Sequence, residues 1–240
     1  PLLIIDHHQL MHNVSSQRVV HHNPRFNKAS IYQSASYLTY KILDKLQPMD
    51  EHLWIAAIGI VSDYDLKDSG DLVKRIEKAY SIENIQKSAL ATLADMIEAA
   101  VSTKAMACEE VVEKLAATND YMELLNNSIM RSAYETVENE IASTLADAAS
   151  KKEIVGDFLF YEVTSKLSIM ALISTKLSEE FPKKTIIVYR QKGNQMKVSA
   201  RAPQGKNLGK MLNKAAEGFA ASAGGHEASA GATVDKKDWE

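Results

Sequence analysis

Residues 2–8 read LLIIDHH, and this stretch decides how the fold of the 240-residue chain is interpreted. The unbroken apolar run 2–5 predicts a short central β-strand that is buried on both faces, because parallel strands covered by helices carry such runs. The run ends at Asp6, which two histidines follow. In an open α/β sheet, ligands bind beyond the carboxyl ends of the strands, so this polar triplet lies where a site is expected.

Helices are predicted to follow this strand. Residues 34–46 place apolar side chains at helical spacing and stop before Pro48. The apolar run 53–61 predicts a buried helix with Asp50 as its N-cap, ending near Asp63. An α/β arrangement of strand and helices is therefore expected in this part of the chain.

The period of the apolar residues changes near Gly156. Upstream, residues 121–145 carry apolar side chains at steps of three or four, which predicts a long connecting helix. Downstream, residues 158–163 alternate, which predicts a strand and a domain boundary before it. The next predicted elements are a helix at 167–181 and two strands, 185–190 and 198–202, joined by a turn at 193–194. A helix at 208–219 and a final strand at 230–234 follow.

The composition limits the partners that the whole surface can attract. The chain has 28 basic and 31 acidic residues and a formal charge of -3, so any site for a polyanion must be local. Its single cysteine, Cys108, cannot form an internal disulfide, which favours a reducing compartment. No apolar run approaches the roughly 18 residues that cross a bilayer. We expect a cytoplasmic protein with no membrane partner.

The Asp6 triplet has the chemistry of a metal site. Two imidazoles beside a carboxylate suit borderline cations such as manganese or zinc. Adjacent residues of an extended segment point to opposite sides, so His7 and His8 are expected to do different jobs, one on metal and one on phosphate. A solvated polar loop accounts for these three residues equally well. The later pair, His21 and His22, is predicted to be solvated.

Asp63 is the second candidate for a metal ligand. It ends the apolar run 53–61, and a metal centre needs several hard oxygen ligands. By spacing alone, a helix-end carboxylate that begins a solvated loop with Asp65 is the simpler interpretation. It becomes a candidate because a metal centre that includes Asp6 and His7 would need further oxygen ligands.

A second group of candidates lies near the C-terminus. Ser199 and Arg201 lie on a predicted strand, and the segment 223–231 is rich in glycine around His226. Glycine lets the backbone approach a phosphate closely, and arginine can grip it with two donors. A hairpin turn with a chance histidine is the alternative for the glycine segment alone.

Together these motifs resemble the DHH phosphoesterase superfamily, specifically the RecJ-like nucleases and their archaeal relatives. Residues 5–8 resemble the third motif of that family, residues 57–63 the fourth, and residues 198–201 with 224–226 the DHH-associated substrate-binding domain. The resemblance implies an α/β fold: the remainder of a parallel-sheet DHH domain, a long linker helix, and a smaller C-terminal α/β domain with a mixed sheet. The expected boundaries are 1–105, 106–153 and 154–240.

The resemblance also implies roles for single residues. His7 and Asp63 would bind metal, Asp6 would support the catalytic motif, and His8 would contact the scissile phosphate. The implied substrate-binding residues are Asn23, Ser199, Arg201, Gly224, Gly225 and His226. One position departs from the family's Gly-Gly-Gly-His pattern, because residue 223 is alanine.

The implied activity is metal-dependent hydrolysis of phosphodiester bonds in single-stranded nucleic acid, as in a RecJ-like exonuclease. Two divalent ions, manganese with magnesium as the alternative, would activate a water and neutralise developing charge. The expected partners are single-stranded DNA or RNA, or short oligonucleotides, with replication or repair proteins as further candidates. The family's first two motifs supply more aspartates and precede the DHH sequence, before which only five residues stand. We therefore expect these 240 residues to be inactive alone.

Two alternatives stay open. A phosphodiesterase for short oligoribonucleotides or cyclic dinucleotides remains a candidate, because long strands are usually held by stacking aromatics, and the C-terminal domain has few outside its expected core. A non-catalytic replication scaffold is the other alternative. The retained His7, Asp63 and Arg201 argue against the scaffold, which would not need them.

Overall fold

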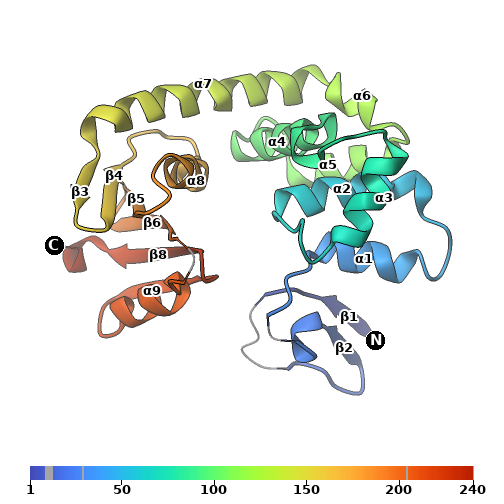
Figure 1. The fold of residues 1–240 in the computed structure, drawn as a ribbon, viewed down its shortest axis with the longest axis horizontal. Coiled ribbons are helices and arrows are strands. Elements are labelled where there is room, and N and C mark those ends of the chain that lie inside the picture. Colours follow the sequence, from blue (N-terminus) through green and yellow to red (C-terminus); the bar gives the residue numbers. More distant parts are fainter. Residues whose placement is uncertain (9–12, 29, 204, 240) are drawn as a thin grey trace. The chain divides into compact units, whose positions relative to one another are not determined.

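The computed structural model divides into two compact units, residues 1–134 and 135–240 (Figure 1). The residues it describes are 1–8, 13–28, 30–203 and 205–239. Among them, no helix is long and apolar enough to cross a membrane. The α/β fold class is confirmed. The three-part division at residues 105 and 153 stays a prediction.

Unit 1 begins with a parallel pair of strands. β1 (Leu2–Ile5) pairs with β2 (Val19–His22), with Ile4 opposite His21. The predicted strand is confirmed, but its predicted burial on both faces is wrong for the residues described, because Leu2 and Leu3 are 56% and 51% exposed. An apolar run indicates what a strand can bury, and the surrounding layers decide what it does bury.

Helices make up most of unit 1, and α2 lies among them. They are α1 (Ala35–Leu43), α2 (Leu53–Ser62), α3 (Gly70–Ala79), α4 (Ala89–Ser102), α5 (Cys108–Ala117) and α6 (Tyr121–Leu125). α2 contacts α1, α3 and α4, and it buries Trp54 and Ile60 almost completely. A helix that is apolar all round is stable only when it is enclosed in this way.

The start of α2 differs from the prediction. Asp50 is not the N-cap of α2, because it opens a 3-10 turn, η2 (Asp50–His52), and His52 takes the N-cap position without a side-chain hydrogen bond. The Asp50 carboxylate instead accepts a 2.5 Å hydrogen bond from Arg75. Because η2 comes first, α2 starts at Leu53 rather than directly after Asp50.

α1 and α2 approach each other closely at one glycine. A Cβ on Gly59 would lie 1.9 Å from Oγ of Ser36, so only glycine fits at this position. The N-cap of α1 is Ser34, whose hydroxyl accepts a hydrogen bond from the Tyr37 amide at 3.2 Å. This contact holds the C-terminal end of α2, and with it Asp63, against the start of α1.

The predicted long helix over residues 121–145 is interrupted. The structure has α6 (Tyr121–Leu125) and then α7 (Ser128–Lys151), 24 residues long. Asn127 caps α7, since its Oδ1 accepts hydrogen bonds from the amides of Ile129 and Met130, both at 3.1 Å. The apolar period continues across the interruption, so periodicity alone does not reveal it.

Unit 2 contains a mixed sheet of six strands in the order β3-β4-β5-β6-β8-β7. β4 and β5 are parallel and the other pairs are antiparallel. Figure 1 shows α8 and α9 on opposite sides of this sheet. The elements are β3 (Glu153–Val155), β4 (Phe158–Glu162), α8 (Met170–Glu180), β5 (Thr185–Lys192), β6 (Gln195–Arg201), α9 (Leu208–Ala216), β7 (Ala221–Gly225) and β8 (Ser229–Asp235).

The glycine segment predicted as a loop lies largely in a strand. Gly224 and Gly225 end β7 and pair with Gly231 and Ala230 of β8. Gly225 has a φ of 145°, and a Cβ there would lie 2.5 Å from the Ala230 Cα. Glycine is rare in strands by propensity, but the close approach of β7 and β8 requires it at this position.

Candidate functional site

The Asp6 carboxylate lies just beyond β1 and is hydrogen-bonded on both oxygens. Oδ1 lies 2.7 Å from Nδ1 of His8 and accepts a 3.2 Å bond from the His8 backbone amide. Oδ2 accepts a 2.9 Å bond from Asn23. Burial opposes ionisation, but the hydrogen bonds from His8, Asn23 and the His7 amide outweigh it and hold the pKa of Asp6 well below its usual range. Asp6 is thus an ionised acceptor that orients His8.

Asn23 is almost fully buried, 2% exposed, and its amide is used within the protein. Its Nδ2 donates to Asp6 and to the His8 carbonyl, at 2.9 and 3.1 Å, and its Oδ1 accepts from the Arg25 amide. These bonds tie the chain after β2 to the chain after β1. The geometry favours a positioning role for Asn23 over the predicted substrate contact.

His7 and His8 lie in different surroundings. His7 is buried and its ring stacks on Tyr32 at 5.4 Å between centroids, whereas the His8 side chain is 70% exposed. His7 Nδ1 is buried and has no hydrogen-bond partner among the residues that the structure describes, and it lies 3.7 Å from Oδ2 of Asp63. That distance is too long for a hydrogen bond. A buried imidazole nitrogen without a partner therefore faces a carboxylate.

Asp63 is positioned by α2 and by Tyr32. It forms the C-cap of α2, where its amide donates to the Gly59 carbonyl at 3.1 Å. The Tyr32 hydroxyl donates to the Asp63 carbonyl at 2.9 Å, and burial together with Asp63 and Asp65 raises the pKa of this phenol. Tyr32 was not singled out in the sequence, because no local pattern marks a tyrosine that lies between two distant motifs.

Asp65 is a buried carboxylate, which corrects its interpretation as part of a solvated loop. It is 1% exposed, and its Oδ2 accepts hydrogen bonds from the Ser34 amide at 2.6 Å and from the Ser69 hydroxyl. Burial raises its pKa against these hydrogen bonds. Through these bonds Asp65 joins the starts of α1 and α3. It therefore helps to fix the position of the chain around Asp63.

His21 also differs from the prediction that it is solvated. Its side chain is 7% exposed, and Nε2 lies 3.6 Å from Oδ2 of Asp6. Its ring packs edge-on against Phe26, with centroids 5.1 Å apart. The parallel pairing of β1 and β2 brings His21 to Asp6, and a pairing between distant segments cannot be read from either segment alone.

Among the described residues, the predicted metal ligands His7 and Asp63 lie close together as a pair. In residues 1–8, 13–28, 30–203 and 205–239, no three His, Cys, Asp or Glu side chains are arranged to hold one ion. His7 and Asp63 are brought together, and Asp6, His8 and Asn23 form a hydrogen-bonded group of their own beside His7. The predicted roles of these residues stay predictions.

In unit 2 the predicted arginine and serine contact helix α8. Nε of Arg201 donates to Thr175 at 3.2 Å, and the guanidinium also approaches the Ala171 carbonyl at 3.5 Å. Ser199 is buried, with its hydroxyl 2.9 Å from that of Ser174. Ser199 therefore joins β6 to α8, and this favours a structural role over a direct contact with substrate.

The Gly-Gly-His segment lies at the same end of the sheet as Arg201, because Arg201 pairs with Ser229 at the start of β8. A turn connects β7 to β8, and the His226 amide donates to the Ser229 carbonyl at 2.7 Å. The first amides of α9 hold this turn, since Gly209 donates to the His226 carbonyl at 3.1 Å. A Cβ on Gly209 would lie 2.8 Å from the Gly225 carbonyl oxygen. The structure thus brings the second group of candidates together.

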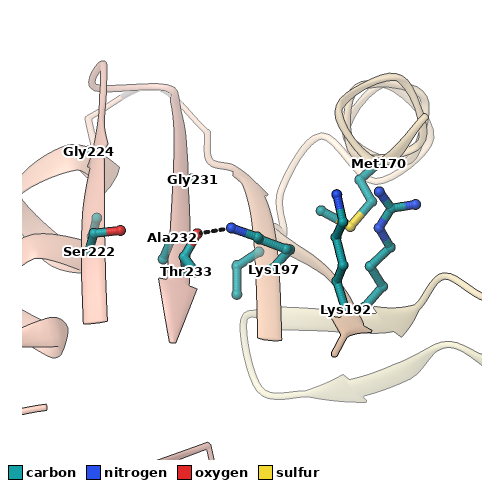
Figure 2. Close-up of a pocket in the computed structure, with 11 residues that line it drawn as sticks. Met170, Lys192, Lys197, Ser222, Gly224, Gly231, Ala232 and Thr233 are labelled. Atoms are coloured by element: carbon teal, nitrogen blue, oxygen red, sulfur yellow. Dashed lines mark hydrogen bonds between the residues drawn. The ribbon is translucent and has the colours of Figure 1, made fainter. Parts of the chain in front are cut away.

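A cavity of about 440 Å³ lies on the sheet of unit 2 (Figure 2), and we call it the cationic pocket. Three of its lining residues are cations, Arg190, Lys192 and Lys197, and none is acidic. Figure 2 shows the Ser222 hydroxyl and the Lys197 ammonium pointing toward each other across β8. The lining residues are Met170, Arg190, Lys192, Lys197, Val198, Ser222, Ala223, Gly224, Gly231, Ala232 and Thr233.

Residues 156–240 match the model of the DHHA1 domain family. A search of curated proteins found no significant match. Among solved structures, the chain is similar to a DHH domain described as a member of the S1P family of ribosomal proteins. The TM-score is 0.68 at 15% identity, over 99% of this chain and 60% of the other.

Three further solved structures are similar to the chain. RecJ of Thermus thermophilus in complex with Mn²⁺ has a TM-score of 0.68 at 15% identity, over 98% of this chain and 39% of RecJ. A pGpG-specific phosphodiesterase of Vibrio cholerae has a TM-score of 0.50 at 12% identity, over 99% of this chain and 81% of the other. RecJ of T. thermophilus is also similar in its Mg²⁺ complex, with a TM-score of 0.65 at 17% identity, over 98% of this chain and 39% of RecJ. The chain thus spans 39% of the length of RecJ and 60% of that of the DHH domain.

Proposed function

This chain carries a DHHA1 domain at residues 156–240 and has a RecJ-like DHH fold, and from that premise we propose that the protein hydrolyses phosphodiester bonds in single-stranded nucleic acid with divalent metal ions. The similar structures support the class of reaction, the cleavage of phosphodiester bonds. Another similar structure is named exonuclease RecJ bound to manganese, with a TM-score of 0.60 at 16% identity over 98% of this chain and 65% of the other. The relative from V. cholerae is named a phosphodiesterase. Both act on phosphodiester bonds.

One observation carries the proposal: the unpartnered Nδ1 of His7 lies 3.7 Å from the Asp63 carboxylate. A buried polar atom without a hydrogen bond is costly, and it is retained where another group satisfies it. Imidazole nitrogen and carboxylate oxygen are both ligands of manganese, and carboxylate is the preferred ligand of magnesium. The pair therefore fits a divalent cation, with manganese preferred and magnesium as the alternative.

The residues around this pair have separable tasks. His7 and Asp63 would hold the cation, while Arg25 and Tyr32 fix their backbone carbonyls at 2.8 and 2.9 Å. Asp6 keeps the exposed His8 ring oriented, so that His8 can donate a hydrogen bond to a non-bridging oxygen of the scissile phosphate. Divalent metal ions, when bound, supply an activated water and neutralise the charge that develops on the phosphate.

A second candidate function is the cleavage of very short substrates. The similarity to a pGpG-specific phosphodiesterase favours it, because pGpG is a linear dinucleotide. Both functions use the same His7 and Asp63 pair and differ in how much nucleic acid the C-terminal unit binds. We propose single strands as the main substrate and keep dinucleotides as the alternative.

The test is a comparison of His7→Ala and Asp63→Asn with the unmodified full-length protein. Each substitution removes a proposed ligand, so we expect manganese-dependent hydrolysis of a single strand to fall by more than about 100-fold. Calorimetric titration with Mn²⁺ alone should show at least about tenfold weaker binding, which measures the ligand role without catalysis.

His52→Ala is the matched control, because His52 is exposed at the N-terminal end of α2, the opposite end from Asp63. It should keep both the rate and the Mn²⁺ affinity. Unchanged Mn²⁺ binding in the two ligand variants would overturn the proposed metal site. A preference for pyrophosphate over every oligonucleotide would overturn the proposed reaction.

We also propose that residues 1–240 alone are inactive, because His7 and Asp63 are too few ligands for a two-metal centre. Assays of this polypeptide with manganese and a single-stranded oligonucleotide should give no turnover above background. Rapid manganese-dependent turnover by the 240 residues would contradict this expectation.

A further inference from the structure

We propose that the cationic pocket of unit 2 is a second phosphate subsite, separate from Arg201 and the Gly-Gly-His turn. It would select strands of several nucleotides over dinucleotides. The inference rests on the proposed function, and it decides between the two substrate classes that the His7 and Asp63 pair leaves open. Its ligand is the backbone phosphate of a single-stranded nucleic acid.

The charge in the pocket is local and uncompensated. Arg190, Lys192 and Lys197 line it, no carboxylate lines it, and none of the three forms an ion pair in the described part of the chain. The chain as a whole carries a formal charge of -3, so this cluster is not part of a general basic surface. Three cations without a counter-charge make an anion site.

Two of the cations are held in place before any ligand binds. Arg190 donates from one nitrogen to the carbonyls of Ser165 and Leu167, at 3.1 and 2.7 Å. The Lys197 ammonium donates to the Thr233 hydroxyl at 2.9 Å, as Figure 2 shows. Groups that are already ordered lose less conformational entropy on binding, so these bonds favour the binding of an anion.

The strand register connects the pocket to the Gly-Gly-His end of the sheet. Alternate residues of β6 share a face, so Lys197, Ser199 and Arg201 lie on one side in three successive rows. The outer rows carry cations. The middle row contains the paired glycines Gly224 and Gly231, and a Cβ on Gly224 would meet nothing within 4 Å. On β6 the middle row is covered, because Ser199 is buried against Ser174 of α8. On β8 and β7, the paired glycines leave an open backbone surface between the two cationic ends.

The two ends are too far apart to mark one phosphate group. Lys197 and Arg201 are four residues apart on β6, roughly 13 Å at about 3.3 Å per residue. A dinucleotide such as pGpG has one internucleotide phosphate, which is the scissile one, and one 5′-phosphate. With the 5′-phosphate at the Arg201 end, none remains for Lys197. A longer strand laid over the glycines of β8 and β7 places a later phosphate in the pocket.

The test compares two probes on the full chain in EDTA, which prevents cleavage. Fluorescence anisotropy measures the binding of a labelled oligodeoxythymidine of about 12 nucleotides and of a labelled dinucleotide. In the variant K192Q/K197Q, we expect the long probe to bind about tenfold more weakly and the dinucleotide to bind unchanged. The slope of log affinity against log salt for the long probe should fall by about 1.4, since each phosphate contact on a single strand contributes about 0.7.

Two variants control for charge and folding. K176Q/K214Q removes two exposed lysines from α8 and α9 outside the pocket and should leave both probes unaffected. K192R/K197R keeps the charge and should retain the affinity for the long probe. Thermal unfolding of K192Q/K197Q should match that of the unmodified chain.

An unchanged affinity for the long probe, or an equal loss for both probes, would overturn the second subsite. The same loss in K176Q/K214Q would overturn it as well, because binding would then follow net charge. Manganese-dependent hydrolysis by the unmodified full-length protein is measured in parallel. If hydrolysis is absent while the binding pattern holds, the proposed reaction fails and the subsite stands.

Discussion

The Asp6 carboxylate shows how the surroundings of one residue set its role. It accepts hydrogen bonds from His8 and Asn23 and has His21 at 3.6 Å. Burial opposes ionisation, but the hydrogen bonds from His8, Asn23 and the His7 amide outweigh it, so the pKa of Asp6 is lower in the folded chain than in the unfolded chain. By linkage, Asp6 stabilises the fold above its unfolded pKa of about 3.9, and this contribution is lost as the pH falls through the lower folded pKa.

Asp6→Asn tests whether Asp6 stabilises the fold at neutral pH and loses this effect at low pH. We expect the substitution to lower the free energy of unfolding by about 1 kcal/mol near neutral pH, because charge-assisted hydrogen bonds are lost. The difference should shrink below about pH 4, where the unfolded carboxylate is protonated. Urea unfolding at several pH values measures it. Asp157→Asn, at a side chain that is 76% exposed, should show no such pH-dependent difference.

Gly224 and Gly225 of β7 should respond differently to substitution by alanine. Gly225→Ala should destabilise unit 2 by about 2 to 4 kcal/mol, because its φ of 145° is strained for alanine and the Cβ would lie 2.5 Å from backbone atoms of β8. Gly224→Ala should change stability by less than about 1 kcal/mol, since its Cβ meets open space. Thermal unfolding distinguishes them, and equal losses would contradict the assigned contacts.

At the scale of elements, helix packing determines where Asp63 lies. α2 ends at Asp63, and its path is set by the contact of Gly59 with Ser36 of α1. Asp65 adds hydrogen bonds to the amide of Ser34 and the hydroxyl of Ser69 at the starts of α1 and α3. The position of the proposed metal ligand is therefore a consequence of how three helices pack.

Gly59→Ala tests this contact. Alanine is the better helix former by about 1 kcal/mol, but its Cβ would lie 1.9 Å from the Ser36 hydroxyl, so we expect a net loss of about 2 to 3 kcal/mol. Gly70→Ala in α3, where a Cβ meets nothing within 4 Å, should be neutral or slightly stabilising. The double variant G59A/S36G removes the obstructing side chain and should recover most of the lost stability.

At the scale of the whole molecule, the proposed chemistry and the proposed strand binding belong to different units. His7 and Asp63 lie in unit 1, and the cationic pocket lies in unit 2. Each unit has its own core, so each can keep its arrangement when the other is perturbed. Binding and hydrolysis should therefore respond separately to the removal of metal.

Chelation is the direct test of this separation. Treatment of the full-length protein with EDTA should abolish hydrolysis while the affinity for a single strand changes by less than about threefold, because the pocket cations need no metal. Fluorescence anisotropy and a gel assay of the same samples measure both quantities. A parallel loss of binding and hydrolysis would show that metal is required to hold the strand.

Much of the fold and of the candidate site was predictable, because local patterns carry it. The strand 2–5, the helices after it and the alternating strands of unit 2 follow from apolar periodicity and turn residues. His7, Asp63 and Arg201 became candidates because their motifs together resemble one family, since each motif alone had a simpler or equally good interpretation. The interruption at Asn127 was missed, since the apolar period runs on across it.

The sequence by itself determined the types and order of most elements and the candidate residues for metal and phosphate, because periodicity and side-chain chemistry are local properties. Only the tertiary structure decided that His21 lies against Asp6, that Asp65 is buried, and that the glycines belong to a strand. Each of these depends on contacts between segments distant in the chain. Strand register and helix packing set those contacts, and neither is written in any one segment.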